Sequence, residues 1–194
     1  MVVPMKSNGR FIVLEGIDGC GKTTIAKLLA KELSNTLITK EPTASSKKIH
    51  AVLQHRAQAP KPLDFQKLYI ADRLIHIKKV IVPALKKGET VICQRYAMST
   101  YAYGMAFGLK EKDVTHEFLI PDVTFILDLP TSVAMERIKK RKEEKEYFEK
   151  REKLAKIRKK YLALAKKSIF GKIILIDAKS EPSTIIKNIL WHMQ

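Results

Sequence analysis

Residues 16–23, GIDGCGKT, combine three glycines with a lysine and a threonine at the spacing G-x-x-x-x-G-K-[ST]. Glycines at these positions let successive backbone N–H groups curl around a phosphate, and the following helix points its positive end at the same anion. We expect Lys22 to bridge the outer phosphates of ATP and the Thr23 hydroxyl to bind the Mg²⁺ ion that neutralises them. The residues expected to hold the nucleotide are Gly16, Ile17, Asp18, Gly19, Cys20, Gly21, Lys22, Thr23 and Thr24.

The segments on either side of this loop have the pattern that the motif requires. RFIVLE (10–15) is an apolar run typical of a strand buried on both faces. After the loop, apolar residues recur at helical spacing at Ala26, Leu29, Ala30 and Leu33. The order strand, loop, helix favours a phosphate loop over an ordinary glycine turn.

Asp18 is an unusual residue for such a loop. Bound phosphates repel a carboxylate among the surrounding amides unless that carboxylate faces another partner. A sugar hydroxyl or a hydrated magnesium ion would be such a partner, whereas a solvent-facing turn aspartate is the alternative. Asp18 is therefore a candidate on both the catalytic and the substrate side.

Four further apolar runs, at 36–40, 89–93, 123–129 and 172–178, predict strands that alternate with helices. We expect Asp64 to cap a long helix that ends near Gly88, with Pro83 as a candidate kink. Residues 136–167 are densely charged, which indicates a solvated flap followed by a long helix. The pattern predicts an α/β fold whose five-stranded parallel sheet has helices on both faces and binds ligands at the carboxyl ends of its strands.

Length and composition limit the class of protein. A chain of 194 residues fits one domain, residues 1–194, and 45% hydrophobic with 29% charged residues is typical of a globular protein. No membrane span or secretory signal is apparent, so we expect a cytoplasmic protein. Cys20 and Cys93 lack a metal-ligand spacing and are expected to be reduced.

The net charge of +17 admits two interpretations. Clustered cations raise the affinity for nucleic acids, but a kinase of phosphorylated small molecules also needs a cationic surface, and Lys/Glu-rich chains are common in hot-growing organisms. We expect no nucleic-acid partner. A basic protein that binds nucleic acid and uses ATP as a switch is kept as an alternative.

With the loop EGIDGCGKTT in place, the chain resembles the thymidylate kinase family from about residue 10 to its C-terminus. The likeness includes PDVTFILDLP (121–130) and FEK…IRKKYLALA. It implies a P-loop nucleoside monophosphate kinase fold with a helical lid at about 137–151, transfer of the ATP γ-phosphate to dTMP, and a homodimer. The motifs that carry it are Lys40-Glu41-Pro42, Asp72-Arg73, Gln94-Arg95-Tyr96, Ser99 and Ala102-Tyr103.

The resemblance also implies roles for individual residues at the acceptor site. Tyr69 would stack on thymine, Arg73 would donate to a carbonyl of its edge, and Arg95 would grip the acceptor phosphate. A core aromatic is the alternative for Tyr69, and a surface salt bridge is the alternative for Arg95. Thr100 would reach the base edge and Tyr103 would crowd the ribose 2′ position. The implied substrate-binding residues are Asp18, Lys40, Glu41, Pro42, Tyr69, Arg73, Arg95, Ser99, Thr100 and Tyr103.

The family places a catalytic arginine either in the phosphate loop or in the flap. Gly19 stands at the loop position, so the flap is expected to supply the cation from Arg137, Arg141 or Arg151, of which Arg141 is the first choice. The implied catalytic residues are Lys22, Arg95, Arg141 and Asp18. Asp177 and Ala178 resemble the loop that frames adenine.

The chain departs from the family at Gln94, where an aspartate is usual. Glutamine can hydrogen-bond to metal-bound water but brings no negative charge. Asp18, Glu41 or Asp128 would then carry more of the metal's coordination shell. A kinase for another nucleotide or for a deoxynucleoside is the second enzymatic interpretation.

Overall fold

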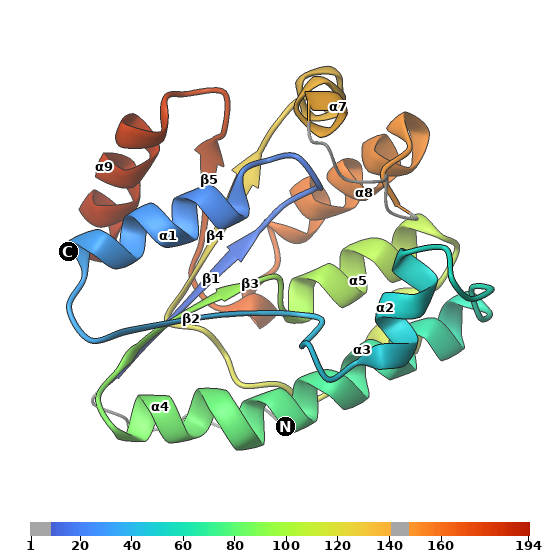
Figure 1. Ribbon diagram of the computed structural model, residues 1–194, viewed down its shortest axis with the longest axis horizontal. Coiled ribbons are helices and arrows are strands. Elements are labelled where there is room, and N and C mark those ends of the chain that lie inside the picture. The colour runs from blue at the N-terminus through green and yellow to red at the C-terminus, as the bar shows by residue number, and fades with distance from the viewer. Residues whose placement is uncertain (1–8, 141–147) are drawn as a thin grey trace.

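The computed structural model of the chain describes residues 9–140 and 148–194. They form a five-stranded parallel sheet between two layers of helices (Figure 1). The strand order is β2-β3-β1-β4-β5. The strands are β1 (Arg10–Glu15), β2 (Thr36–Lys40), β3 (Thr90–Gln94), β4 (Val123–Asp128) and β5 (Ile173–Asp177).

β1 is the central strand, and its apolar run is buried on both faces. Phe11, Ile12, Val13 and Leu14 are each at most 1% exposed. β1 pairs in parallel with β3 on one side and with β4 on the other, so Leu14 lies beside both Gln94 and Phe125. The predicted five-stranded parallel sheet is confirmed, and each predicted strand matches an observed one to within a residue or two.

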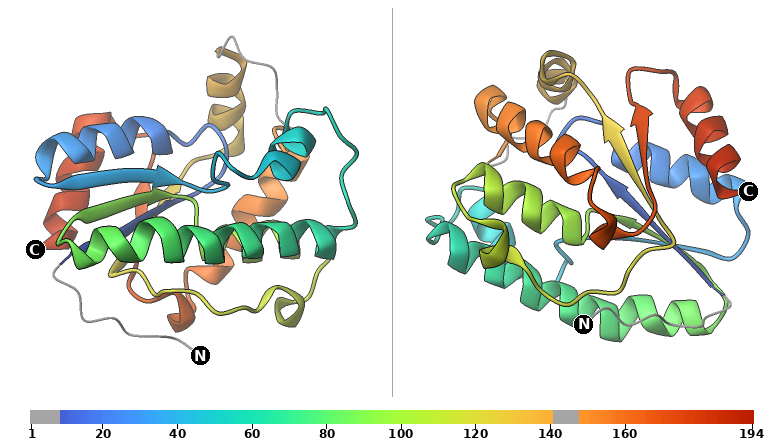
Figure 2. Two further views of the ribbon diagram at one scale, coloured as in Figure 1. Left: turned by 60° about the horizontal axis from the view of Figure 1, so that its bottom comes forward. Right: turned by 180° about the vertical axis from the view of Figure 1, so that it is seen from behind.

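Helices cover both faces of the sheet, as the two further views show (Figure 2). α1 and α9 pack together on one face, whereas α3, α4, α5 and α8 cover the other. The helices are α1 (Lys22–Glu32), α2 (Lys47–Leu53), α3 (Pro62–His76), α4 (Val82–Lys86), α5 (Ala97–Ala106), α6 (Glu111–Val114), α7 (Thr131–Lys140), α8 (Arg151–Leu164) and α9 (Pro182–Met193), with a π-helical turn η1 (Ile77–Ile81) and a 3₁₀ turn η2 (Ser168–Phe170).

The long helix expected from Asp64 to Gly88 is present, but it begins earlier and changes its winding. α3 starts at Pro62 with Lys61 as its N-cap, so the prediction that Asp64 caps it is wrong, and Asp64 lies in the first turn. Proline fits the start of a helix because the N–H that it lacks has no partner there. The π-helical turn η1 precedes Pro83 in α4, where the missing N–H interrupts the regular hydrogen bonding.

The long charged helix after the flap is confirmed as α8. Of the predicted lid at about 137–151, residues 141–147 lie outside the described part of the chain, and with them Arg141. Within the described residues, no helix is long and apolar enough to cross a membrane. Cys20 and Cys93 are buried free thiols.

Candidate functional site

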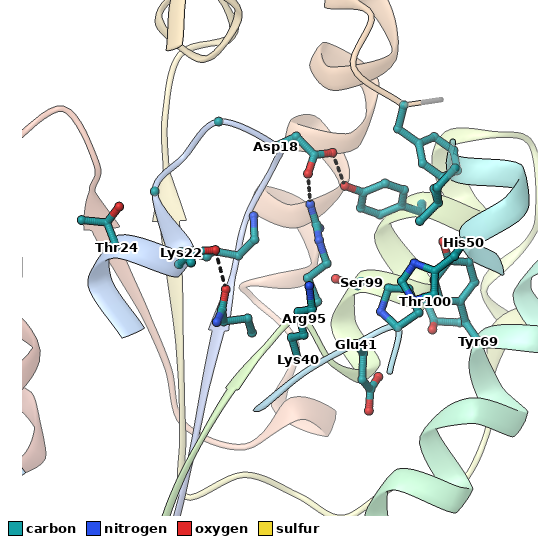
Figure 3. A pocket seen from close by; sticks show the side chains of 18 of the residues that line it. Asp18, Lys22, Thr24, Lys40, Glu41, His50, Tyr69, Arg95, Ser99 and Thr100 are labelled. Atoms are coloured by element: carbon teal, nitrogen blue, oxygen red, sulfur yellow. Dashed lines mark hydrogen bonds and ion pairs between the residues drawn. The ribbon is translucent and has the colours of Figure 1, made fainter. Parts of the chain in front are cut away.

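A cleft of about 590 Å³ opens at the carboxyl ends of the strands, within the size range of small-molecule sites (Figure 3). Its walls come from the glycine loop, the ends of β2 and β3, and helices α2, α3, α5 and α7. The lining residues are Asp18, Gly19, Gly21, Lys22, Thr23, Thr24, Lys40, Glu41, Pro42, His50, Leu53, Gln66, Tyr69, Gln94, Arg95, Ser99, Thr100, Tyr103, Arg137 and Phe148.

The glycine loop needs residues without side chains because it lies against other backbone. Gly16 and Gly19 have φ angles of 132° and 81°. A Cβ added at Gly16 would lie 2.6 Å from the Leu127 carbonyl oxygen, and one at Gly19 would lie 2.7 Å from the Ala134 carbonyl oxygen. The loop is thereby fixed against the end of β4 and against α7, and α1 begins directly after it at Lys22.

Lys22 turns its ammonium group back into the loop. Its Nζ donates to the carbonyl oxygens of Gly16 and Ile17, each at 2.9 Å. Burial and the charge of Arg95 lower the pKa of Lys22. Arg95 also donates to the Gly16 carbonyl, at 3.2 Å, so two cations converge on one backbone oxygen. This part of the cleft is suited to polyphosphate.

Asp18 forms the counter-charge to these cations. It forms an ion pair with Arg95 and accepts a hydrogen bond from the Tyr103 hydroxyl at 3.2 Å, as Figure 3 shows. Burial acts to raise the pKa of Asp18, but the charges of Arg95 and Lys22 outweigh it, and the net effect is a lowered pKa. The Arg95 guanidinium also lies over the ring of Tyr103, 5.2 Å from its centroid. Asp18 is therefore a paired carboxylate in the wall of the cleft, not a solvent-facing turn residue.

A second, deeper group of charges lies behind the wall formed by Thr100. Arg73 is 1% exposed, pairs with Glu41 at 2.7 Å, and donates from Nη1 to the Thr100 hydroxyl at 2.9 Å. His76 also contacts Glu41, with 3.0 Å between its Nδ1 and the carboxylate. Arg73 is not among the lining residues, so in this structure it supports Thr100 from behind. Direct contact of Arg73 with a base stays a prediction.

His116 completes the surroundings of Arg73. Its Nε2 lies 2.9 Å from Arg73 Nη1, and because the guanidinium can only donate, Nε2 must be the acceptor. Nδ1 then carries the hydrogen and donates to the Val114 carbonyl at 2.8 Å. Burial and the charge of Arg73 lower the pKa of His116 to about 4. The imidazole is therefore neutral at physiological pH.

A buried carboxylate, Glu15, supports the cleft wall at Ser99 from behind. It is 0% exposed and accepts hydrogen bonds from the Ser99 hydroxyl at 2.7 Å and the Tyr161 hydroxyl at 2.9 Å, besides the backbone N–H of Tyr96 at 2.8 Å. Burial raises the pKa of Glu15 despite these donors. Through Tyr161, the network ties α8 to the strand that leads into the glycine loop.

The candidate metal ligands are also engaged. The Thr23 hydroxyl donates to Gln94 Oε1 at 2.8 Å. Of the carboxylates expected to compensate for Gln94, Asp18 pairs with Arg95, and Glu41 pairs with Arg73. The third, Asp128, accepts from Nε and NH2 of Arg158 at 2.7 and 2.8 Å. Of the three, Asp18 belongs to the glycine loop itself and is therefore the better candidate.

A further cluster, Glu41, His76 and Cys93, brings three potential metal-ligand atoms within 4.8 Å of one another. The Glu41 carboxylate is already shared by Arg73 and His76, and burial raises the pKa of the Cys93 thiol well above its usual value. A cation here would also face the Arg73 guanidinium. The cluster is better explained as a hydrogen-bonded support than as a metal centre.

Arg137 is the candidate flap arginine that reaches the cleft. It lies on α7 one turn after Ala134, donates to the Ala178 carbonyl at 3.1 Å, and approaches Gly21. Ala178 follows β5 and is fully buried, so the predicted adenine loop lies beside Arg137. Arg151 is exposed at the start of α8 and does not line the cleft.

The structure brings most of the predicted site residues into one cleft. The exceptions are Gly16, Ile17 and Cys20 within the loop, Arg73 behind Thr100, Asp177 and Ala178 beyond Arg137, and Arg141, which lies outside the described residues. Four lining residues were not predicted as site residues: His50, Leu53, Gln66 and Phe148. Gln66 was detectable, because it lies one helical turn before Tyr69 on the same face of α3. His50 and Leu53 lie on a helix that the sequence did not indicate.

Comparisons with known proteins agree with this geometry. The thymidylate kinase family model matches residues 14–189. The chain is 37% identical to a probable thymidylate kinase of Thermococcus kodakarensis over 93% of this chain and 95% of that protein. It is 36% identical to the thymidylate kinase of Coprothermobacter proteolyticus over 95% of this chain and 98% of that protein. A solved thymidylate kinase structure from Candida albicans has the same fold, with a TM-score of 0.79, 23% identity, and coverage of 97% of this chain and 92% of that one. The chain belongs to the thymidylate kinase family.

Proposed function

We propose that the chain transfers the γ-phosphoryl group of ATP to dTMP, giving ADP and dTDP, in the cleft described above. The observation that carries this is the position of Arg95, which shares the Gly16 carbonyl with Lys22 and is held by Asp18 and Tyr103. A donor phosphate on the loop and an acceptor phosphate at Arg95 would therefore be neighbours. The acceptor phosphate is already anionic, so the reaction needs positioning and charge neutralisation rather than a general base.

The acceptor nucleotide would extend from Arg95 toward α3. Lys40 is a second cation for its phosphate, and Tyr69 with Thr100 forms the base end of the cleft. Phe148 packs edge-on against Tyr103, with 4.8 Å between the ring centroids, and closes this end from above the ribose position. A Tyr103 ring fixed by Phe148 and by its hydroxyl bond to Asp18 is suited to exclude a ribose 2′-hydroxyl.

Mg²⁺ fits the donor set at the phosphate end of the cleft. Thr23 Oγ1, oriented by its hydrogen bond to Gln94, and the Asp18 carboxylate are the oxygen donors that would hold it. When bound, the ion neutralises charge on the phosphates. Gln94→Glu keeps the length and the acceptor but adds charge, so it should lower the Mg²⁺ concentration for half-maximal rate. An unchanged Mg²⁺ dependence would remove Gln94 from the metal site.

Arg137 is our proposed nucleotide-side cation within the described part of the chain, while Arg141 stays a prediction. A side chain at Gly19 has no space because of the Ala134 backbone, so the loop itself cannot carry an arginine there. Arg137, one turn further along α7, reaches the rim of the same loop. We propose that it contacts the base or the phosphates of ATP.

Replacing Lys22 tests the proposed function directly. Lys22→Ala should lower dTMP-dependent ADP formation by at least about 100-fold, because the variant removes a preorganised cation from the transferring phosphates. Lys27→Ala, on the exposed face of α1, is the matched control and should keep near-native activity. Near-native activity of Lys22→Ala would contradict the proposal. Acceptor assays with dTMP, dUMP, dCMP and dGMP, each with ATP, should rank dTMP first.

We also propose a homodimer and a cytoplasmic location, which the family resemblance favours. Leu74 and Ile75 are 50% and 55% exposed side by side on α3, an apolar pair that association would bury. Leu74→Glu should lower the mass measured by light scattering from dimer to monomer. Trp191→Glu, at a 68% exposed position on α9, should leave the mass unchanged. A wild-type monomer at micromolar concentration would refute the dimer.

A further inference from the structure

Gln66 is a buried polar residue in the wall of the cleft. It is 4% exposed and lies on α3, one turn before Tyr69 and two turns before Arg73. Residues at this spacing share one face of a helix. The face directs Tyr69 and Gln66 into the cleft and Arg73 into the support behind it. Gln66 therefore lies at the base end of the cleft, away from the phosphate loop.

The amide of Gln66 has no hydrogen-bond partner among the described residues, in contrast to Gln94, which accepts from Thr23. Within the same part of the chain, no fully enclosed side-chain nitrogen or oxygen lacks a partner. The small exposed area of Gln66 must therefore include its amide atoms, and these atoms face the cleft. A nearly enclosed amide without a protein partner costs stability unless water or a ligand satisfies it, so this one requires an explanation.

Gly104 leaves room for the Gln66 side chain between α3 and α5. A Cβ at position 104 would lie 3.4 Å from Gln66 Cγ and 2.6 Å from Val114 Cγ1. Gly104 lies one turn after Thr100, the residue that Arg73 binds. The two helices therefore meet at two successive levels: the Arg73–Thr100 bond is buried, and the Gln66 amide, about 6 Å further along, is left for a ligand.

We propose that the Gln66 amide hydrogen-bonds to the polar edge of the pyrimidine ring of the acceptor, which makes it a further substrate-binding residue. The inference rests on the proposed function of the cleft. Thymine presents two carbonyl acceptors and one N3–H donor. Arg73 can only donate, and the Thr100 hydroxyl already accepts from it. An amide supplies both a donor and an acceptor and can pair with N3–H and an adjacent carbonyl.

Gln66→Met tests this because methionine keeps the length of the side chain and removes its hydrogen bonds. The Michaelis constant for dTMP should rise about fivefold to tenfold, the value expected for a neutral hydrogen bond. The value for dUMP should rise by the same factor, because uracil has the same polar edge. The Michaelis constant for ATP should change less than twofold. The Tm should stay constant or rise, because the variant removes an unpaired amide from the free protein.

Gln54→Leu is the matched control, since Gln54 is exposed at the end of α2, and it should leave all four values unchanged. The inference fails if Gln66→Met changes the dTMP constant less than twofold. It also fails if the variant lowers the Tm and weakens ATP and dTMP alike, which would indicate a structural role. Calorimetric binding of dTMP separates the two proposals. If the unaltered chain binds dTMP without phosphorylating it and Gln66→Met weakens that binding, the proposed function falls and the role of Gln66 stands.

Discussion

Gly19→Ala should separate the effect of backbone strain from that of crowding at the glycine loop. Gly19 has a φ of 81° and Gly88 a φ of 79°, so an alanine at either position is strained to the same degree. This strain costs about 1–2 kcal/mol, partly offset by a stiffer unfolded chain worth about 0.4–1 kcal/mol. A Cβ at Gly88 meets no atom within 4 Å, whereas one at Gly19 lies 2.7 Å from Ala134 O. Gly88→Ala should therefore cost roughly 1 kcal/mol.

Gly19→Ala adds overpacking of about 1–3 kcal/mol to the same strain, for a total of about 2–4 kcal/mol. In a domain of this size the Tm should fall by about 4–16 °C, against about 2–4 °C for Gly88→Ala. Because α7 must move away from the loop, the Michaelis constant for ATP should rise in Gly19→Ala alone. Urea unfolding followed by circular dichroism measures the loss in free energy of unfolding, and steady-state kinetics measures the Michaelis constant for ATP. Equal unfolding costs for the two variants would refute the reasoning.

Two further predictions concern the buried partners of Arg73, first Glu41 and then His116. Glu41→Gln should cost about 3 kcal/mol because it leaves a buried guanidinium without its counter-charge, whereas the exposed control Glu32→Gln should cost less than about 0.5 kcal/mol. The double variant Glu41→Gln/Arg73→Met should lose less free energy of unfolding than the sum of the losses in the two single variants. Additive losses in urea unfolding would contradict the buried ion pair. For His116, the pKa is about 4 in the folded protein against 6.5 ordinarily, so the unfolded state binds more protons between these values. The free energy of unfolding should therefore fall as pH drops from about 6.5 to 4, by roughly 1–2 kcal/mol after allowance for a partly exposed ring. His116→Gln should reduce this acid loss and His192→Gln should not, as equilibrium unfolding at pH 7 and pH 4.5 would measure. Equal acid loss in both variants would contradict a neutral His116.

The sheet and the phosphate loop were predictable because each depends on local sequence. Buried parallel strands need continuous apolar runs, and RFIVLE and TLITK both end where the structure ends β1 and β2. The loop glycines were recognisable from the spacing of the motif, and at Gly16 and Gly19 the contacts with other backbone leave no room for a side chain. The family resemblance added Arg95, Thr100 and Tyr103, and the structure places all three in the cleft wall.

The missed elements depend on tertiary contacts instead. α5 contains β-branched and aromatic residues of modest helix propensity, and it is stabilised by burial against α3 and α8. α2 is only seven residues long, too short to be stable in isolation. The ion pairs of Arg73 with Glu41 and of Arg158 with Asp128 join segments about 30 positions apart, and no local pattern predicts such a pairing.

Arg95, Gln66 and Glu15 depart from the usual rules of backbone conformation or burial, and all three lie in the cleft or directly behind its wall, which supports the assignment of the cleft independently of the motifs. Arg95 has a φ of 62°, unfavourable for a residue with a long side chain, and its backbone N–H is held by Leu14 O at 2.9 Å. The nearly enclosed Gln66 amide has no partner among the described residues, and Glu15 is a carboxylate with no exposed surface. Each feature lowers the stability of the free protein, and each lies where a nucleotide would contact it or the groups that it holds. These features lower the free energy of unfolding at the carboxyl ends of the strands, as expected where residues serve binding and catalysis rather than folding.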